Sequence, residues 1–218
     1  MGNHPNICEQ HFNTQELVHN TRLVVITGGP GAGKTAVLEM AKKTLCDHVA
    51  ILPEAASIVF SGGFWRLEST SARLAAQRAI VHVQKEMEYL VLSEHQWSVG
   101  LCDRGSLDGI AYWPGDESAF WCVTGTSLEE EYERYFSVIH LRSPSEEHGY
   151  NHQNPLRIES ASQASIIDQK ICSIWSRHPR YRAIESTPDF LTKARIAMQH
   201  IADDLPECCR RSKLSVEC

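Results

Sequence analysis

The sequence lacks the features of several large protein classes. It has no basic excess, because 21 Lys and Arg stand against 27 Asp and Glu, giving a net charge of −6. This balance argues against a broad nucleic-acid-binding surface, which needs a basic face. No run approaches the ~18 consecutive apolar residues of a membrane-spanning helix, and the N-terminus has neither the basic nor the apolar region of a signal peptide. We therefore expect a cytoplasmic protein without a membrane span.

The cysteines and histidines also lack familiar spacings. The eight cysteines include no CxxC pair, and the eleven histidines form no HExxH or zinc-finger pattern. We expect reduced thiols, with small core or half-buried side chains at Cys46, Cys102, Cys122 and Cys172. The cysteines of the C-terminal tail are interpreted as incidental.

The length and the even composition favour one domain. The 218 residues contain no long low-complexity linker. We expect a polar flexible arm at 1–20, a single domain at 21–205 and a short tail at 206–218. No exposed apolar stripe stands out, so the oligomeric state stays open.

Strand-like apolar runs alternate with helical segments along this domain. Strands are expected at 23–27, 49–52, 98–102, 136–141 and 181–185, and helices at 33–46, about 70–94, 106–113, 117–123, from 127 onward, 165–177 and 189–204. The long helix should turn Leu74, Val81, Met87, Leu90 and Val91 inward, and Thr187 should cap the last helix. Residues 142–163 are rich in Pro, Ser, His and Asn and predict a flap. This alternation is typical of a doubly wound α/β fold.

A glycine-rich loop follows the first predicted strand. Residues 28–35 read Gly-Gly-Pro-Gly-Ala-Gly-Lys-Thr, a complete GxxxxGK[ST] motif between a β-branched run and a helix. Such glycines let backbone N–H groups converge on phosphates, Lys34 adds a mobile positive charge, and the Thr35 hydroxyl suits a Mg²⁺ ion. The predicted nucleotide-binding residues of this loop are Gly29, Pro30, Gly31, Ala32, Gly33, Lys34, Thr35 and Ala36.

Polar residues end three other predicted strands. Ligands of open parallel sheets bind at the carboxyl ends of the strands. Because these ends meet at one edge of the sheet, we expect Glu54, Asp103, Arg104 and Arg142 to lie near the loop. Asp103 closes an apolar strand, where an acid can hold Mg²⁺ or, alternatively, cap the next helix. Arg104 suits the oxygens of a phosphoryl group or acceptor, because its fork makes contacts that a lysine cannot.

Three segments resemble a known family. Residues 103–112 read Asp-Arg-Gly-Ser-Leu-Asp-Gly-Ile-Ala-Tyr, similar to the DRxxxD/SxxAY segment of thymidylate-kinase-like P-loop kinases and closer to the DRGxxDxxAY segment of the AAA-type, NadR-like family, which includes the ribosylnicotinamide kinase domain. Residues 52–56, Leu-Pro-Glu-Ala-Ala, resemble its PEAA segment, and 28–31 its loop variant. The resemblance spans about 22–205. It implies a three-layer P-loop NTPase fold with a five-stranded parallel sheet in the order 2-3-1-4-5.

The resemblance also implies roles for individual residues. In the wider group the acid that ends the second strand lies near the acceptor, so Glu54 would contact or deprotonate an acceptor hydroxyl; the alternative is a surface Glu at a helix start. Related flaps are rich in arginine, whereas here only Arg142 and Arg157 are candidates to clamp phosphates. The alternative is that Arg142 and Arg157 are simply exposed residues of the flap. Arg73, Gln77 and Gln84 of the long helix are further candidates to reach an acceptor.

Two functions remain in view. The first is ATP- and Mg²⁺-dependent phosphoryl transfer to a small metabolite, a nucleoside or nucleotide, with Lys34, Asp103, Arg104 and Glu54 as the catalytic residues and Thr35 with Asp103 as the metal ligands. The second is a regulatory NTPase or switch that binds ATP or GTP without kinase activity. The guanine-reading [NT]KxD pattern is missing, which favours ATP. The sequence does not identify the acceptor, whose pocket we expect around Glu54, the long helix, Trp65 and Trp113.

Overall fold

The computed structural model describes residues 20–144, 161–187, 189–207 and 209. This part of the chain contains β1 (Arg22–Thr27), α1 (Lys34–Thr44), β2 (Val49–Leu52), α2 (Ala55–Ser61), α3 (Thr70–Glu94), β3 (Val99–Asp103), α4 (Asp108–Tyr112), α5 (Glu117–Thr124), α6 (Leu128–Arg134), β4 (Ser137–Leu141), α7 (Ala161–Trp175), β5 (Tyr181–Ile184) and α8 (Phe190–Asp204). The predicted arm, and the flap from 145 to 160 with Arg157, lie outside the described residues.

The strands form one five-stranded sheet in the order β2-β3-β1-β4-β5. Every pair of neighbouring strands is parallel. The predicted fold class and strand order are therefore confirmed.

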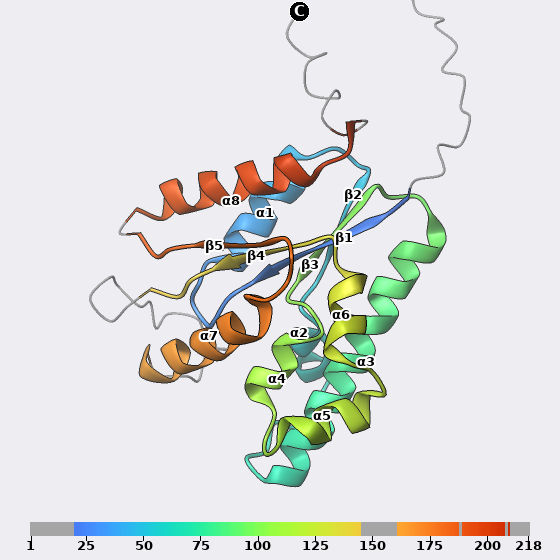
Figure 1. Cartoon of the computed structure of the whole chain (residues 1–218), viewed down its shortest axis with the longest axis vertical. Coiled ribbons are helices and arrows are strands. Elements are labelled where there is room, and N and C mark those ends of the chain that lie inside the picture. Colours follow the sequence, from blue (N-terminus) through green and yellow to red (C-terminus); the bar gives the residue numbers. More distant parts are fainter. Residues whose placement is uncertain (1–19, 145–160, 188, 208, 210–218) are drawn as a thin grey trace, which may run out of the picture.

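Alternating side chains of the central strand divide the core into two halves. Val24 and Ile26 of β1 belong to a buried cluster with residues of α1 and α8, whereas Leu23 and Val25 belong to a second cluster with residues of α3 and α7. Figure 1 shows the same division, with α1 and α8 on one side of the sheet and α3 to α7 on the other. A strand buried on both faces explains the unbroken apolar run in this part of the sequence.

The register brings the carboxyl ends of the strands to one edge of the sheet. Ile26 of β1 pairs with Asp103 of β3, and Thr27 pairs with His140 of β4. Leu52, the last residue of β2, pairs with Cys102. The loops that follow β1, β2 and β3 therefore start side by side, as parallel topology requires.

Several local predictions need correction. Helix α2 was missed because it is only seven residues long and ends at a glycine pair. The N-cap of α8 is Asp189 rather than Thr187; its carboxylate accepts from the N–H groups of Leu191 and Thr192 at 3.0 and 3.1 Å. Helix α7 already begins at Ala161, within the predicted flap.

The inward face of α3 is partly polar. Leu90 was predicted to point inward but is 55% exposed, whereas Gln84 and Glu88 are buried beside Val81 and Val91. Burial therefore follows the 3.6-residue helical period, and two of its positions carry polar side chains. An apolar pattern alone could not reveal them.

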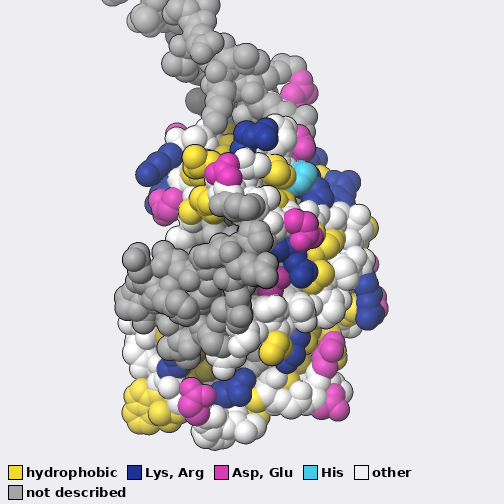
Figure 2. Space-filling model, turned by 90° about the vertical axis from the view of Figure 1, so that its left-hand side faces the viewer, with side chains coloured by type: hydrophobic (Ala, Val, Ile, Leu, Met, Phe, Trp, Pro, Cys, Tyr) yellow, Lys and Arg dark blue, Asp and Glu magenta, His cyan; other side chains and the backbone are white. Residues whose placement is uncertain are grey.

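The described residues include no helix with the length and apolar character to cross a bilayer. On the face shown in Figure 2, Lys and Arg side chains are interspersed with Asp and Glu side chains. The described part of that face therefore has no broad basic area.

Candidate active site

The loop between β1 and α1 is shaped by two glycines with positive φ. Gly28 has φ of 141°, and a Cβ atom there would lie 2.1 Å from the carbonyl oxygen of Leu141. Gly33 has φ of 95°, and its Cβ would lie 2.5 Å from the Phe190 ring. Both positions need glycine, because a side chain would clash and the backbone conformation disfavours one. Gly33 is also the N-cap of α1, and no side chain caps that helix. Its first N–H groups therefore face the loop and suit an anion.

Lys34 lies almost buried at the start of α1, with 8% of its surface exposed. Its Nζ atom donates to the carbonyl oxygens of Gly28 at 2.9 Å and Gly29 at 3.3 Å. Burial, with a smaller effect from Arg104, lowers the pKa of Lys34 to about 8. A phosphate group placed in the loop would offset that burial and favour the charged form of the amine.

Asp103 ends β3 and lines the same cavity as Thr35. Its Oδ1 atom is buried and has no hydrogen-bond partner in the described part of the chain. Burial raises the pKa of this carboxyl group, although Lys34 opposes the shift. An unsatisfied carboxylate oxygen and a hydroxyl group from two residues of one cavity are ligands that suit a hard cation such as Mg²⁺. Thr35 and Asp103 therefore fit the predicted metal.

Arg104 connects three parts of the site. Its Nε atom donates to Glu54 Oε1 at 2.6 Å, and its Nη1 atom donates to the carbonyl oxygen of Gly28 and to Asp108 Oδ2, each at 3.1 Å. Its guanidinium also lies over the Tyr112 ring at 5.5 Å. Arg104 has φ of 76°, an uncommon conformation for a residue with a side chain. The surrounding contacts hold the arginine in that conformation.

Glu54 follows β2 and is the N-cap residue of α2. Burial alone would raise its pKa, but Arg104 and a hydrogen bond from Ser57 at 2.5 Å outweigh this effect and lower the pKa to about 2. Such a carboxylate is a weak base. It is better suited to accept a hydrogen bond from a ligand than to remove a proton completely.

Asp108 lies in segment 103–112, which resembles the kinase family, but the resemblance did not imply a role for it. The side chain is buried, and its Oδ2 accepts from the Thr27 hydroxyl at 2.6 Å as well as from Arg104. Its Oδ1 accepts from Trp175 Nε1 at 2.7 Å. Asp108 thus fixes the guanidinium of Arg104 against the end of β1.

Two residues that sequence reasoning missed brace the glycine-rich loop. Asp168 of α7 accepts from the N–H of Gly29 at 2.9 Å and from Nε2 of His140 at 2.9 Å. Lys193 of α8 donates from Nζ to the carbonyl oxygens of Ala32 at 2.9 Å and Arg142 at 2.5 Å. Each is a single polar residue on an otherwise ordinary helix, so no motif could have marked it.

Arg142 lies next to this brace. Its Nε atom pairs with Asp168 Oδ2 at 3.1 Å, and it is not among the residues that line the cavity. The other predicted clamp, Arg157, falls outside the described residues.

One cavity of about 1460 Å³ joins these groups. It extends from the glycine-rich loop past Asp103, Arg104 and Glu54 to α2, α3 and α4. The candidates of α3 all line it, namely Arg73, Gln77 and Gln84. Trp65, which is 77% exposed, stands at its rim with Phe64 and Leu67. Trp113, by contrast, is buried in the core against Phe120 and does not line the cavity.

Comparisons with known proteins agree with this fold. A family model described as an AAA domain matches residues 23–190. No curated protein matches the chain. Among solved structures, thymidylate kinase from Candida albicans has a TM-score of 0.58 at 14% identity, covering 84% of this chain and 93% of that one.

Two further structures are similar over comparable lengths. Thymidylate kinase from Ehrlichia chaffeensis has a TM-score of 0.53 at 12% identity, covering 84% of this chain and 98% of that one. Deoxyadenosine kinase from M. mycoides, solved with bound dATP, has a TM-score of 0.54 at 14% identity, covering 83% of this chain and 98% of that one. At these identities the likeness establishes the fold.

Proposed function

This chain belongs to the AAA domain family, and from that premise we propose that it is a P-loop kinase that transfers a phosphoryl group from ATP to a nucleoside or nucleotide in the cytoplasm. The kinase structures that share its fold support this choice. The NadR-like subfamily is part of the proposal, supported by the segments at 52–56 and 103–112.

The size and lining of the cavity carry this proposal. Pockets for one drug-sized ligand measure roughly 300–1000 Å³, and this cavity measures about 1460 Å³. One end is lined by the glycine-rich loop, and the other by Glu54, Gln77 and Tyr112. Arg104 lies between the two ends. This arrangement has room for a donor and an acceptor, whereas a switch that binds one nucleotide needs only the first end.

The loop and its neighbours would hold the donor. The backbone N–H groups from Gly29 to Ala36 and the amine of Lys34 would bind the phosphates, and Thr35 with Asp103 would hold Mg²⁺. The ion would neutralise charge on the phosphate oxygens. Arg104, already fixed by Asp108 and Glu54, would stabilise charge that develops between donor and acceptor.

The role of Glu54 depends on the chemical group of the acceptor. For an acceptor hydroxyl, Glu54 would accept its hydrogen bond and orient it toward the donor. Its low pKa makes orientation the larger contribution, which suits a reaction whose rate comes mainly from positioning. For an acceptor phosphate, which is already ionised, no base is needed.

A transfer assay tests this function. Purified protein is incubated with γ-labelled ATP, Mg²⁺ and a panel of nucleosides and nucleotides, and the products are separated. We expect label in at least one acceptor and none with Lys34→Ala, because that variant loses the phosphate-binding amine. Tight ATP binding without transfer to any member of the panel would contradict the kinase assignment.

One observation favours the alternative of a regulatory nucleotide-binding protein. Arg142 is held by Asp168 outside the cavity and does not reach toward the phosphates. Thermal shift with ATP, GTP and Mg²⁺ separates the two functions when combined with the transfer assay. A ligand at a hundredfold excess over its Kd stabilises the folded state by about 2.7 kcal/mol. Stabilisation by GTP alone, without transfer, would establish the alternative.

A further inference from the structure

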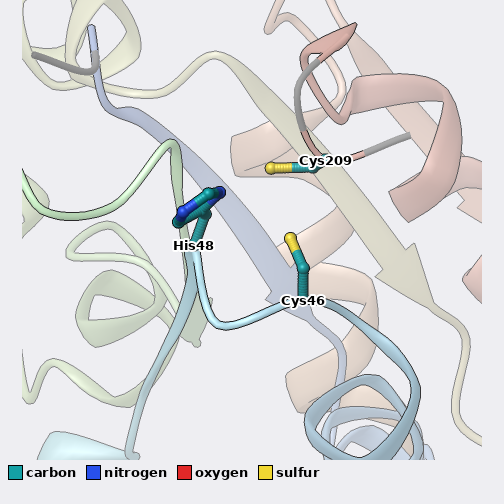
Figure 3. A group of neighbouring side chains, drawn as sticks. All are labelled: Cys46, His48 and Cys209. Atoms are coloured by element: carbon teal, nitrogen blue, oxygen red, sulfur yellow. The ribbon is translucent and has the colours of Figure 1, made fainter. Parts of the chain in front are cut away.

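A second group of side chains lies at the opposite edge of the sheet. Cys46 and His48 belong to the connection between α1 and β2, and Cys209 follows α8. Their ligand atoms all lie within 4.8 Å of one another, and Figure 3 shows the three side chains pointing toward a common space. We propose that Cys46, His48 and Cys209 bind a transition-metal ion of the Zn²⁺ type.

The spacing of the ligand atoms supports this site. Tetrahedral zinc has bonds of about 2.3 Å to sulfur and 2.0–2.1 Å to nitrogen, which places its ligand atoms about 3.6–3.8 Å apart. The observed upper limit of 4.8 Å exceeds that separation by about one ångström. A difference of this size is within the reach of side-chain rotation.

Backbone hydrogen bonds connect each of the three ligand residues to its surroundings. The carbonyl oxygen of His48 accepts from the N–H groups of Ser98 and Val99 at 2.8 and 3.3 Å, which ties this connection to the start of β3. The N–H of Val49 donates to the carbonyl oxygen of Cys46 at 3.1 Å, and that of Cys209 donates to Pro206 at 3.0 Å. Metal sites are strengthened when their ligands are held in place before the ion arrives.

The environment gives the ion an entry path. Cys209 is 4% exposed within the core cluster of α1 and α8, Cys46 is half-buried at the edge of this cluster, and His48 is exposed. An ion would enter past His48 and meet the thiolates beneath it. Three protein ligands leave a fourth position for water.

The donor atoms distinguish this site from the predicted Mg²⁺ site. Thiolate and imidazole ligands favour Zn²⁺ and similar ions, whereas Mg²⁺ prefers oxygen. His48 precedes the first residue of β2, and Glu54 of the cavity follows its last residue. Because all strands are parallel, the two sites occupy opposite edges of the sheet.

Such an ion would fasten the C-terminal segment to the body of the domain. Cys209 is buried, so interpreting the tail cysteines as incidental was wrong for this residue. The site has no known sequence spacing, because Cys209 lies far along the chain from Cys46 and His48. Cys208 lies outside the described residues and is not part of the proposed site.

Cobalt titration of the full-length, reduced protein tests the site directly, because Co²⁺ bound by thiolates has a characteristic absorption band. We expect one Co²⁺ per chain, displaced by Zn²⁺, and a rise in Tm with Zn²⁺. Cys46→Ala and His48→Gln should each weaken binding at least about 100-fold, since even a partner outside the ligand shell contributes 10–100-fold. His48 is exposed, so its variant keeps the test valid if Cys46→Ala misfolds.

Matched variants separate this proposal from the kinase assignment. Cys122→Ala removes an exposed thiol of α5 and should leave cobalt binding unchanged. Lys34→Ala should also keep it, while His48→Gln should retain ATP binding. The absence of a thiolate-to-cobalt band in the wild type would overturn the proposal, as would an unaltered band in His48→Gln. A Cys46–Cys209 disulfide in place of metal binding would overturn it equally.

Discussion

Arg104 is the residue on which most contacts of the candidate active site converge. It joins Glu54, the carbonyl oxygen of Gly28 and Asp108, and its own carbonyl oxygen accepts from Gln84 at 3.3 Å. A lysine cannot make these contacts at once, because its charge is a single point. The arginine therefore acts through its shape as well as its charge.

Replacing Arg104 with lysine tests this role. We expect kcat/KM for phosphoryl transfer to fall by roughly 10²–10³-fold, the range for removing one donor that stabilises a transition state. Arg66→Lys is the matched control, because Arg66 lines the same cavity but is exposed. Activity of Arg104→Lys within a factor of two of the control would show that the fork has no part in transfer.

Lys34 links nucleotide binding to proton uptake. Its pKa is lowered to about 8, and bound phosphates should raise it. Near pH 8 the unliganded amine is partly deprotonated, so binding should take up a fraction of a proton, and affinity should fall as pH rises above 8. Calorimetry in two buffers of different ionisation enthalpy measures this uptake.

The control for this prediction is Lys34→Arg, whose side chain stays protonated throughout this range and should show no uptake. Equal binding enthalpies in both buffers for the wild type would contradict a titrating Lys34.

Residues of the candidate active site could be predicted from the sequence only where a suitable residue type occurs within a recognisable motif or at the end of a predicted strand. Lys34, Asp103, Arg104 and Glu54 each lie at or next to the end of a regular element, and the structure places all four in one cavity. Their catalytic roles stay predictions. Asp168 and Lys193 could not be found, because contacts between distant helices and a loop leave no local pattern.

At the scale of elements, α7 and α8 each hold the glycine-rich loop by one polar side chain, Asp168 and Lys193. We expect Asp168→Asn to weaken ATP binding about tenfold, since it removes the charge that receives the Gly29 N–H and pairs with Arg142. The neutral amide keeps the size of the side chain, so the fold should persist. Titration calorimetry with ATP measures the effect.

Asp116→Asn is the control for this change. Asp116 caps α5 at the surface, and asparagine caps helices equally well. Wild-type ATP affinity in Asp168→Asn would show that the loop needs no brace from α7.

The elements themselves were predictable where local physics decides them. The helix expected from residue 127 onward is present, and it begins at a capping box formed by Ser127 and Glu130. Glu131, in the first turn of the same helix, is by contrast buried and pairs with Lys85 and Arg134, each at 2.7 Å. Tertiary contacts of this kind override local interpretation, as they do for Leu90.

At the scale of the whole molecule, the two opposite edges of the parallel sheet carry different kinds of ligand atoms. Its carboxyl edge gathers the oxygen-rich cavity, and its amino edge gathers Cys46, His48 and Cys209. The strand order was implied by family resemblance and is confirmed. The second group was beyond prediction, because only the folded chain brings Cys209 to the connection after α1.

Titration calorimetry with ATP, in the presence and absence of Mg²⁺, tests the central claim most directly. The account predicts one ATP per chain in the wild type, tighter with Mg²⁺, and loss of the Mg²⁺ effect in Asp103→Asn, because the amide lacks the negative charge of the buried, unsatisfied carboxylate. Absence of ATP binding in the wild type, or an unchanged Mg²⁺ effect in Asp103→Asn, would contradict it.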